Sequence, residues 1–422
     1  MNTNLSTLSN GIRVVTCEMP HMQSVTFGLW AGVGGRHEVK RVSGISHFIE
    51  HMLFKGTRRR TARQIGQEVE SVGGYLNATT THDHTVYYGA APANQFRRLT
   101  AVLCDMYMEP RFAEIDIRKE RSVIAEEILM YQDEPSELVQ EMLWEDLWPD
   151  HGLGRSLTGT LETIAQINKD DFLKFRANFY HAGNTIVSAA GCVRHEDVVT
   201  RAEALLGSLP RGKKAVGRAA PVLPAHPRIR IDQRDTQQTH VAFGVPACDL
   251  YAEDRFAVTL LNILLAGNMS SRLFQELREK RGLCYSVSSS VSHYADTGVL
   301  NFYVGLDAKN LALAMRLIGR EFARLRNEPV KVSELKRAKD YAIGSARMSL
   351  ERSTAQSSRL GYSVLFYGQV VDPEIVHNRL LQVTPEEIQR IAQATLRPEC
   401  MTLSLVGPVA PTAPICDWMS NG

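Results

Sequence analysis

GGYLNATT, at residues 73–80, is the stretch that decides the expected fold, because a similar stretch, GLCYSVSS, follows at residues 282–289. Both are typical of strands that a glycine introduces. An amphipathic helical segment precedes each of them, at residues 62–72 and 271–280. A second strand-like segment and a long helix follow, and that helix ends near residue 110 in one half and near residue 329 in the other. The chain therefore reads as two repeats of about 210 residues.

This duplication predicts the fold class and the domains. Strands follow one another through hairpins and helical excursions, without strict strand–helix alternation. We therefore expect an α+β fold of two similar repeats, each a largely antiparallel β-sheet with helices packed on one face. Residues 207–227 are rich in Gly, Pro and basic residues, as linkers are. The expected organisation is an N-terminal domain over residues 1–208, a linker over 209–227 and a related C-terminal domain over 228–422.

The composition of the chain argues against several classes of binding partner. The 422 residues carry 48 Lys+Arg and 46 Asp+Glu, a formal net charge of +2, which argues against nucleic acid or an anionic membrane surface as the main partner. No apolar run approaches the ~18 residues that a membrane span needs, so we expect no membrane insertion. The N-terminus lacks a secretory pattern, and the seven cysteines form no Cys-x-x-Cys pair. These features predict a cytoplasmic protein.

A metal-site pattern lies in the first repeat, where residues 47–51 read His-Phe-Ile-Glu-His. On a helix, which Ser43 or Ser46 could cap, His47 and His51 stand one turn apart and can face one ion. Glu50 lies about 60° from His47 and about 100° from His51 around the helix, so it can reach a water beside the ion without being a ligand. Two histidines at this spacing also occur on ordinary surfaces and in cores, so the pentapeptide alone leaves both interpretations open.

A third ligand is available in the strongly helical segment 116–131. Glu120 and Glu127 share one face of this helix with Val123 and Ile124. Carboxylates on an apolar face are costly unless they are paired or bind a metal. We interpret Glu127 as the third ligand, and Glu120 as a carboxylate that accepts a hydrogen bond from a ligand imidazole. The alternative is a solvent-facing row of glutamates balanced by neighbouring basic residues.

Residues 47–51 followed by Glu127 resemble the motif of the pitrilysin and mitochondrial processing peptidase family, the inverted zincins. Further matching stretches lie at residues 54–57, 74–78, 120–124 and 154–160. The resemblance covers essentially the whole chain, including its two repeats, and the chain length is like that of the short-subunit bacterial branch. It implies a zinc-dependent endopeptidase that acts on unfolded peptides or short protein segments.

The resemblance also implies a role for individual residues of the first repeat. One Zn2+ per chain would be held by His47, His51 and Glu127, with Glu50 as the general base. Family members bind their peptide substrate as an added strand beside the active-site sheet. In this chain that strand would run along residues 76–79, which makes Asn77 and Ala78 the candidates for contacts with the substrate backbone.

The second repeat has no metal ligand in the equivalent helix, at residues 261–265. By resemblance, Arg278 and Tyr285 match a pair that holds the substrate carbonyl. The alternative is an ordinary basic helix end. Short-subunit relatives close face to face in pairs, so the resemblance implies a homodimer, or a heterodimer with a related chain. The alternative function is a non-catalytic or partner-dependent peptide-binding scaffold subunit, although such subunits lose the metal ligands that this chain retains.

Overall fold

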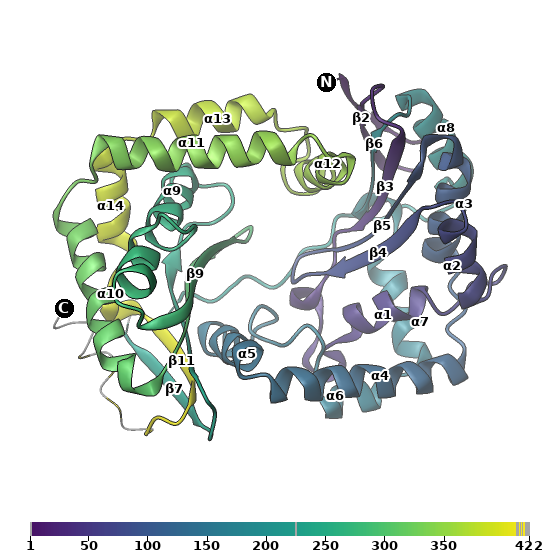
Figure 1. Cartoon of the computed structure of the whole chain (residues 1–422). Helices are drawn as coiled ribbons and strands as arrows, with labels where there is room; N and C mark the ends of the chain where they lie inside the picture. Colours follow the sequence, from purple (N-terminus) through teal and green to yellow (C-terminus); the bar gives the residue numbers. More distant parts are fainter. Residues whose placement is uncertain (1, 224–225, 411–412, 414, 416, 418–422) are drawn as a thin grey trace. The chain divides into compact units, whose positions relative to one another are not determined.

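The computed structural model describes residues 2–223, 226–410, 413, 415 and 417 (Figure 1). Its internal contacts divide the chain into two compact units. The first unit consists of Met1–Leu129, Arg155–Arg218 and Arg347–Asp372. The second consists of Met130–Gly154, Ala219–Ala346 and Pro373–Gly422. Each unit is therefore built from three separate segments of the sequence, and each contains one β-sheet.

The sheet of the first unit has the strand order β1-β2-β6-β3-β5-β4. Its strands are β1 (Asn2–Thr7), β2 (Arg13–Glu18), β3 (Ser24–Ala31), β4 (Tyr75–Thr80), β5 (Thr85–Pro92) and β6 (Thr185–Gly191). β2 and β6 pair in parallel, while the other neighbours are antiparallel. β4 forms an edge of the described sheet, in a hairpin that aligns Thr80 with Thr85.

Helices cover both faces of this sheet. They are α1 (Ile45–Leu53), α2 (Ala62–Glu70), α3 (Phe96–Met108), α4 (Glu114–Asp133, whose last turn is assigned to the second unit), α6 (Leu161–Gln166), α7 (Lys169–Phe179), α8 (His195–Leu206) and α12 (Ser353–Tyr367). One core includes the buried rings of Phe27, Phe48 and Tyr107. On the opposite face α12 packs against β2, β3 and β6, where its Leu360 joins a second core with Trp30 (Figure 1).

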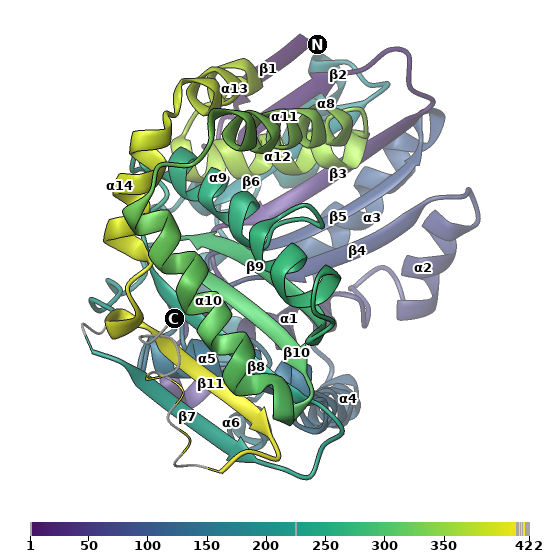
Figure 2. The ribbon, with the colours of Figure 1, turned by 60° about the vertical axis from the view of Figure 1, so that its left-hand side comes forward.

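The second unit repeats this plan with the strand order β7-β11-β8-β10-β9. Its elements are β7 (Arg228–Gln233), β8 (Thr239–Ala247), β9 (Cys284–His293), β10 (Gly298–Leu306), β11 (Thr402–Gly407), α5 (Pro135–Leu147), α9 (Arg255–Leu265), the π-helix η5 (Phe274–Glu279), α10 (Leu311–Asn327), α11 (Val332–Ser349, whose last residues are assigned to the first unit), α13 (Pro373–Gln382) and α14 (Pro385–Thr395). β7 and β11 pair in parallel. Helix α10 lies across the sheet (Figure 2), where the ring of Phe322 contacts those of Phe243 and Phe302.

The predicted α+β class, with two similar sheets packed with helices, is confirmed. The sequence interpretation missed the helix on the second face of each sheet. α12 covers the first sheet and α5 the second, and each comes from the half of the sequence that supplies the other sheet. An amphipathic pattern reveals that a helix has an apolar face, not which sheet that face covers. The boundaries at residues 208 and 228 stay a prediction, and residues 224–225 of the predicted linker lie outside the described residues.

Short 3-10 turns connect several elements, at Gly35–His37, Lys40–Val42, Ala93–Gln95, Ala182–Asn184, Ala308–Asn310 and Pro398–Cys400. Within the part of the chain that the structure describes, no helix has both the length and the apolar character that a membrane span requires. The described cysteines are free thiols: Cys17, Cys104, Cys192, Cys248, Cys284 and Cys400.

Candidate metal centre

Helix α1 carries the first two candidate ligands. Its buried side chains, which include Phe48, Ile49 and Met52, hold one side of the helix in the core. His47 and His51 lie on another side and keep partial exposure. The helix begins after Gly44, whose φ of 91° is costly for any residue with a side chain. A Cβ at Gly44 would also lie 2.5 Å from the carbonyl oxygen of Thr158, so only glycine fits here.

Glu38 caps this helix from outside it. The two oxygens of its carboxylate accept hydrogen bonds from the backbone N–H groups of Gly44, at 2.7 Å, and Ser46, at 2.8 Å. The carboxylate replaces the capping side chain that Gly44 lacks, and its charge lies at the positive end of the helix. Burial raises the pKa of Glu38 to about 7, although the two backbone hydrogen bonds oppose that rise. The expectation of a serine cap is therefore wrong, since capping comes from a residue six positions before Gly44.

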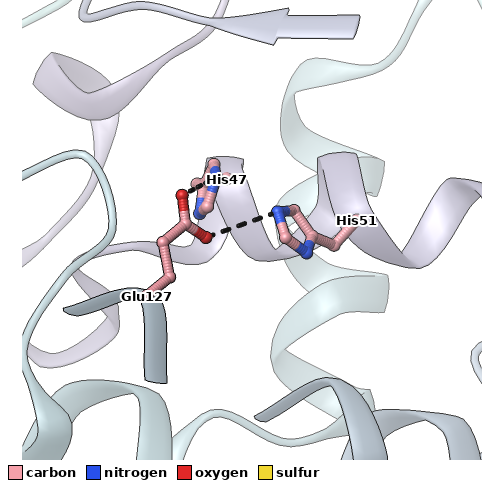
Figure 3. Close-up of side chains that lie close together, drawn as sticks. All are labelled: His47, His51 and Glu127. Atoms are coloured by element: carbon pink, nitrogen blue, oxygen red, sulfur yellow. Dashed lines mark ion pairs between the residues drawn. The ribbon is translucent and has the colours of Figure 1, made fainter. Parts of the chain in front are cut away.

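Glu127, on α4, completes a cluster of three candidate ligands (Figure 3). Nε2 of His47 lies 3.9 Å from Oε1 of Glu127, and Nε2 of His51 lies 3.8 Å from its Oε2. One ligand atom from each residue lies within 4.8 Å of the others. Among the described residues, this is the one group of three His, Cys, Asp or Glu side chains that meets this criterion.

The cluster fits a zinc ion. Two imidazole nitrogens and one carboxylate oxygen are a ligand set of catalytic zinc sites, which keep a further coordination position open. Burial, assisted by the charge of the neighbouring His51, lowers the pKa of His47 to about 4, so its ring is neutral at pH 7, as a metal ligand must be. Nδ1 of His47 is buried and has no hydrogen-bond partner among the described residues.

Glu120 lies beside the cluster and is 4% exposed. Its Oε1 accepts a hydrogen bond from Nδ1 of His51 at 2.8 Å, and its Oε2 lies 2.7 Å from Nζ of Lys55. Burial raises the pKa of Glu120, but the hydrogen bonds from His51 and Lys55 and the positive charge of Lys55 outweigh it, and the net shift is downward. The ionised carboxylate therefore favours a proton on Nδ1 of His51 and leaves Nε2 free toward Glu127. The sequence interpretation missed Lys55, although it stands four residues after His51.

The face of α4 differs in one respect from the expected one. Its buried residues are Ile117, Glu120, Ile124 and Ile128. Val123 is 51% exposed, so its assignment to the apolar face is wrong. With 3.6 residues per turn, Val123 stands about 100° from Ile124, which lies close to the centre of the buried face. Glu127 lies at the border of that face, where its carboxylate remains accessible to an ion.

Glu50 points from α1 toward β4. The hydroxyl of Thr80 donates a hydrogen bond to its Oε2. Burial raises the pKa of Glu50, while the hydrogen bond from Thr80 and the charge of His51 lower it, and the net shift is upward. Glu50 therefore has a partly buried carboxylate that accepts a hydrogen bond from Thr80, and it lies on the same helix as His51. The sequence interpretation did not include Thr80.

Asn77 and Ala78, the candidates for contacts with the substrate backbone, lie on β4, an edge strand of the described sheet. Thr81 N–H donates to the carbonyl of His84, and from there the antiparallel alternation directs the backbone groups of Ala78 away from β5. The side-chain oxygen of Asn77 accepts a hydrogen bond from the Ala78 N–H at 2.8 Å. β4 therefore presents an open edge of the described sheet, with Asn77 beside it.

In the second unit, the structure brings Arg278 and Tyr285 together. The Arg278 guanidinium carbon lies 5.7 Å from the centre of the Tyr285 ring and 5.0 Å from that of Phe274. Arg278 belongs to the π-helix η5, a kind of helix often found at functional sites. Tyr285 is 74% exposed on β9.

Family models match most of the chain. The model described as "Insulinase (Peptidase family M16)" matches residues 13–161, and the model described as "Peptidase M16 inactive domain" matches residues 166–341. An uncharacterized zinc protease of Rickettsia bellii is 36% identical over 408 residues, which cover 96% of this chain and 98% of the relative. The uncharacterized zinc protease YmxG of Bacillus subtilis is 34% identical over 402 residues, which cover 95% of this chain and 97% of that relative.

Solved structures share the fold at lower identity. A peptidase M16 inactive domain from Pseudomonas fluorescens has a TM-score of 0.90 at 20% identity, over 98% of this chain and all of that one. A protease from Helicobacter pylori has a TM-score of 0.90 at 22% identity, over 96% of this chain and 99% of that one. A chain of complex III2 from Candida albicans has a TM-score of 0.85 at 17% identity, over 99% of this chain and 100% of that one.

Proposed function

Because the chain belongs to the peptidase M16 family, the insulinase and pitrilysin family, we propose that it is a zinc metalloendopeptidase that hydrolyses peptide bonds in unfolded peptides or short protein segments. One observation carries the proposal. His47, His51 and Glu127 converge on one point, and the partly buried carboxylate of Glu50 lies on the same helix beside them. A metallopeptidase of this kind needs both a metal site and a base, and these residues of the first unit offer candidates for both.

The three converging residues would hold one zinc ion per chain. Bound zinc acts as a Lewis acid that polarises a peptide carbonyl and activates water. Glu50 accepts the proton of the attacking water as general base and returns it to the leaving amine. The raised pKa of Glu50 supports this role, because a base works best when its pKa lies nearer the working pH. Glu120 holds the ring of His51 and keeps its proton on Nδ1.

The substrate would bind as an added strand. The open edge of β4 supports this, since the backbone groups of Ala78 point away from β5, and Asn77 lies beside them. Arg278 and Tyr285 would hold the substrate carbonyl, with the exposed Tyr285 hydroxyl donating to the developing oxyanion. They would serve the zinc of the same chain or that of a partner.

The partner would be a second copy of this chain or a related chain. The likeness to a chain of complex III2 supports assembly, since it places this fold in a multi-subunit complex. The chain carries both the candidate metal ligands and the Arg278–Tyr285 pair, which favours the homodimer. A non-catalytic scaffold subunit would have no need for a complete ligand set with a base beside it.

The test combines metal analysis with mapping of cleavage products by mass spectrometry on a broad peptide library. We expect one zinc per chain, cleavage within unstructured peptides, loss of cleavage with a chelator and its return with zinc. Glu127→Gln should lose zinc, whereas the control Glu126→Gln, at the exposed neighbouring position, should keep it. A folded, zinc-loaded protein that cleaves no peptide of the library contradicts the proposal.

A further inference from the structure

Thr80 is the side chain of β4 that contacts the candidate base. Exposure alternates along this strand, so Leu76, Ala78 and Thr80 face the protein while Thr79 faces outward. α1 packs against β4, and the Thr80 hydroxyl donates its hydrogen bond to Oε2 of Glu50 across that contact. The contact is internal to the first unit.

We propose that Thr80 is a positioning residue that fixes the orientation of the Glu50 carboxylate for proton transfer, an inference that rests on the proposed function. A carboxylate at the end of a glutamate rotates broadly about its last torsion. A hydrogen bond to Oε2 fixes that torsion and leaves Oε1 as the atom that receives the proton of the attacking water. Proton transfer depends on such alignment, and a misplacement of about 1 Å can cost about 100-fold in rate.

The local structure makes Thr80 suited to this role. A β-branched side chain has restricted rotation about χ1, so the direction of its hydroxyl is set by the backbone. That backbone is held by pairing of Thr80 with Thr85 and by the turn in which Thr81 N–H donates to the His84 carbonyl. By the same alternation, the backbone groups of Thr80 face the open edge, as those of Ala78 do. The strand on which substrate would add is thus also the strand that orients the base.

The chain offers a matched set of variants. Thr80→Val removes the hydroxyl and keeps the shape, Thr80→Ser keeps a hydroxyl, and Thr7→Val makes the same chemical change at an exposed position of β1, the strand at the opposite edge of the same sheet. For Thr80→Val we expect kcat to fall by about 10- to 100-fold with KM within about twofold of the wild type, and with zinc content and melting temperature retained. Thr80→Ser should recover most of kcat, and Thr7→Val should behave like the wild type.

A crystal structure of metal-free Thr80→Val gives a readout that does not depend on turnover. We expect the Glu50 carboxylate to rotate from its wild-type position there, and to stay in place in Thr7→Val. Three results overturn the inference: wild-type kcat in Thr80→Val, a loss of zinc or of thermal stability that accounts for the fall in kcat, or an unmoved Glu50. If Thr80→Val has wild-type kcat while Glu50→Gln is inactive, the inference fails and the proposed function stands. A wild-type protein without peptidase activity makes the proposed function fail.

Discussion

Nζ of Lys55 lies 2.7 Å from Oε2 of Glu120, whose other carboxylate oxygen accepts the hydrogen bond of a candidate zinc ligand, His51. The positive charge of Lys55 thus helps to keep Glu120 ionised in a buried position. Glu120 in turn presents the free ring nitrogen of His51 toward Glu127. Through these two contacts Lys55, which is not a candidate ligand, would support zinc binding by His51.

Removing the contact of Glu120 with His51, or that of Lys55 with Glu120, should reduce zinc affinity without unfolding the protein. We expect Glu120→Gln to raise the zinc dissociation constant by about 10- to 100-fold, the usual effect of losing a partner of a ligand imidazole. Lys55→Met should have a smaller effect in the same direction, because Lys55 is partly exposed and solvent screens its charge. Competition with a chromogenic chelator measures both affinities. Unchanged affinity in Glu120→Gln would show that Glu120 does not support the site.

The start of α1 should tolerate glycine alone. Gly44 and Gly11 both have φ near 100°, at 91° and 103°, so alanine at either position is strained. At Gly44 the added Cβ would also lie 2.5 Å from the carbonyl oxygen of Thr158, whereas at Gly11 no atom lies within 4 Å. We expect Gly44→Ala to lower the free energy of unfolding by about 2 kcal/mol more than Gly11→Ala does. Equal losses in urea denaturation would contradict the close packing at Gly44.

Glu38 should make stability depend on pH. Its pKa is about 7 in the folded protein against 4.5 ordinarily, so the folded protein holds this proton more tightly than the unfolded chain. The free energy of unfolding should then fall as pH rises from about 4.5 to about 7, by roughly 3 kcal/mol from this group. Glu38→Gln removes the titration, so its stability should fall less over that range. Denaturant unfolding of both proteins at several pH values tests this, and parallel pH profiles would refute it.

The sequence predicted the parts of the site that depend on local spacing. His47 and His51 were identified because helical periodicity places residues four apart on one side. Glu127 was identified because it is a carboxylate on an otherwise apolar helix face, and the structure brings the three together. Glu38, Lys55 and Thr80 were missed because their roles depend on contacts that periodicity does not encode. Glu38 reaches a helix that starts later in the chain, and Thr80 reaches Glu50 only because β4 packs against α1.

The fold, like the site, could be predicted where it depends on local sequence patterns and not where it depends on long-range packing. Two repeated strand patterns predicted two sheets, and the structure has two. The positions of α5 and α12 were not predictable in this way, because each helix covers the sheet formed mostly by the other half of the sequence. Which sheet a helix covers depends on the fit between its apolar face and the apolar face of that sheet. The sequence pattern identifies the apolar face of each helix but not the surface against which it packs.

The most direct test of the account is the turnover of Glu50→Gln at full zinc occupancy. Glutamine keeps the shape of Glu50 but does not accept a proton at neutral pH. We predict that Glu50→Gln binds one zinc per chain with wild-type affinity and wild-type melting temperature, while kcat on a cleaved peptide falls by at least about 100-fold. Zinc-loaded Glu50→Gln that cleaves the same peptide at the wild-type rate would contradict the assignment of Glu50 as the base.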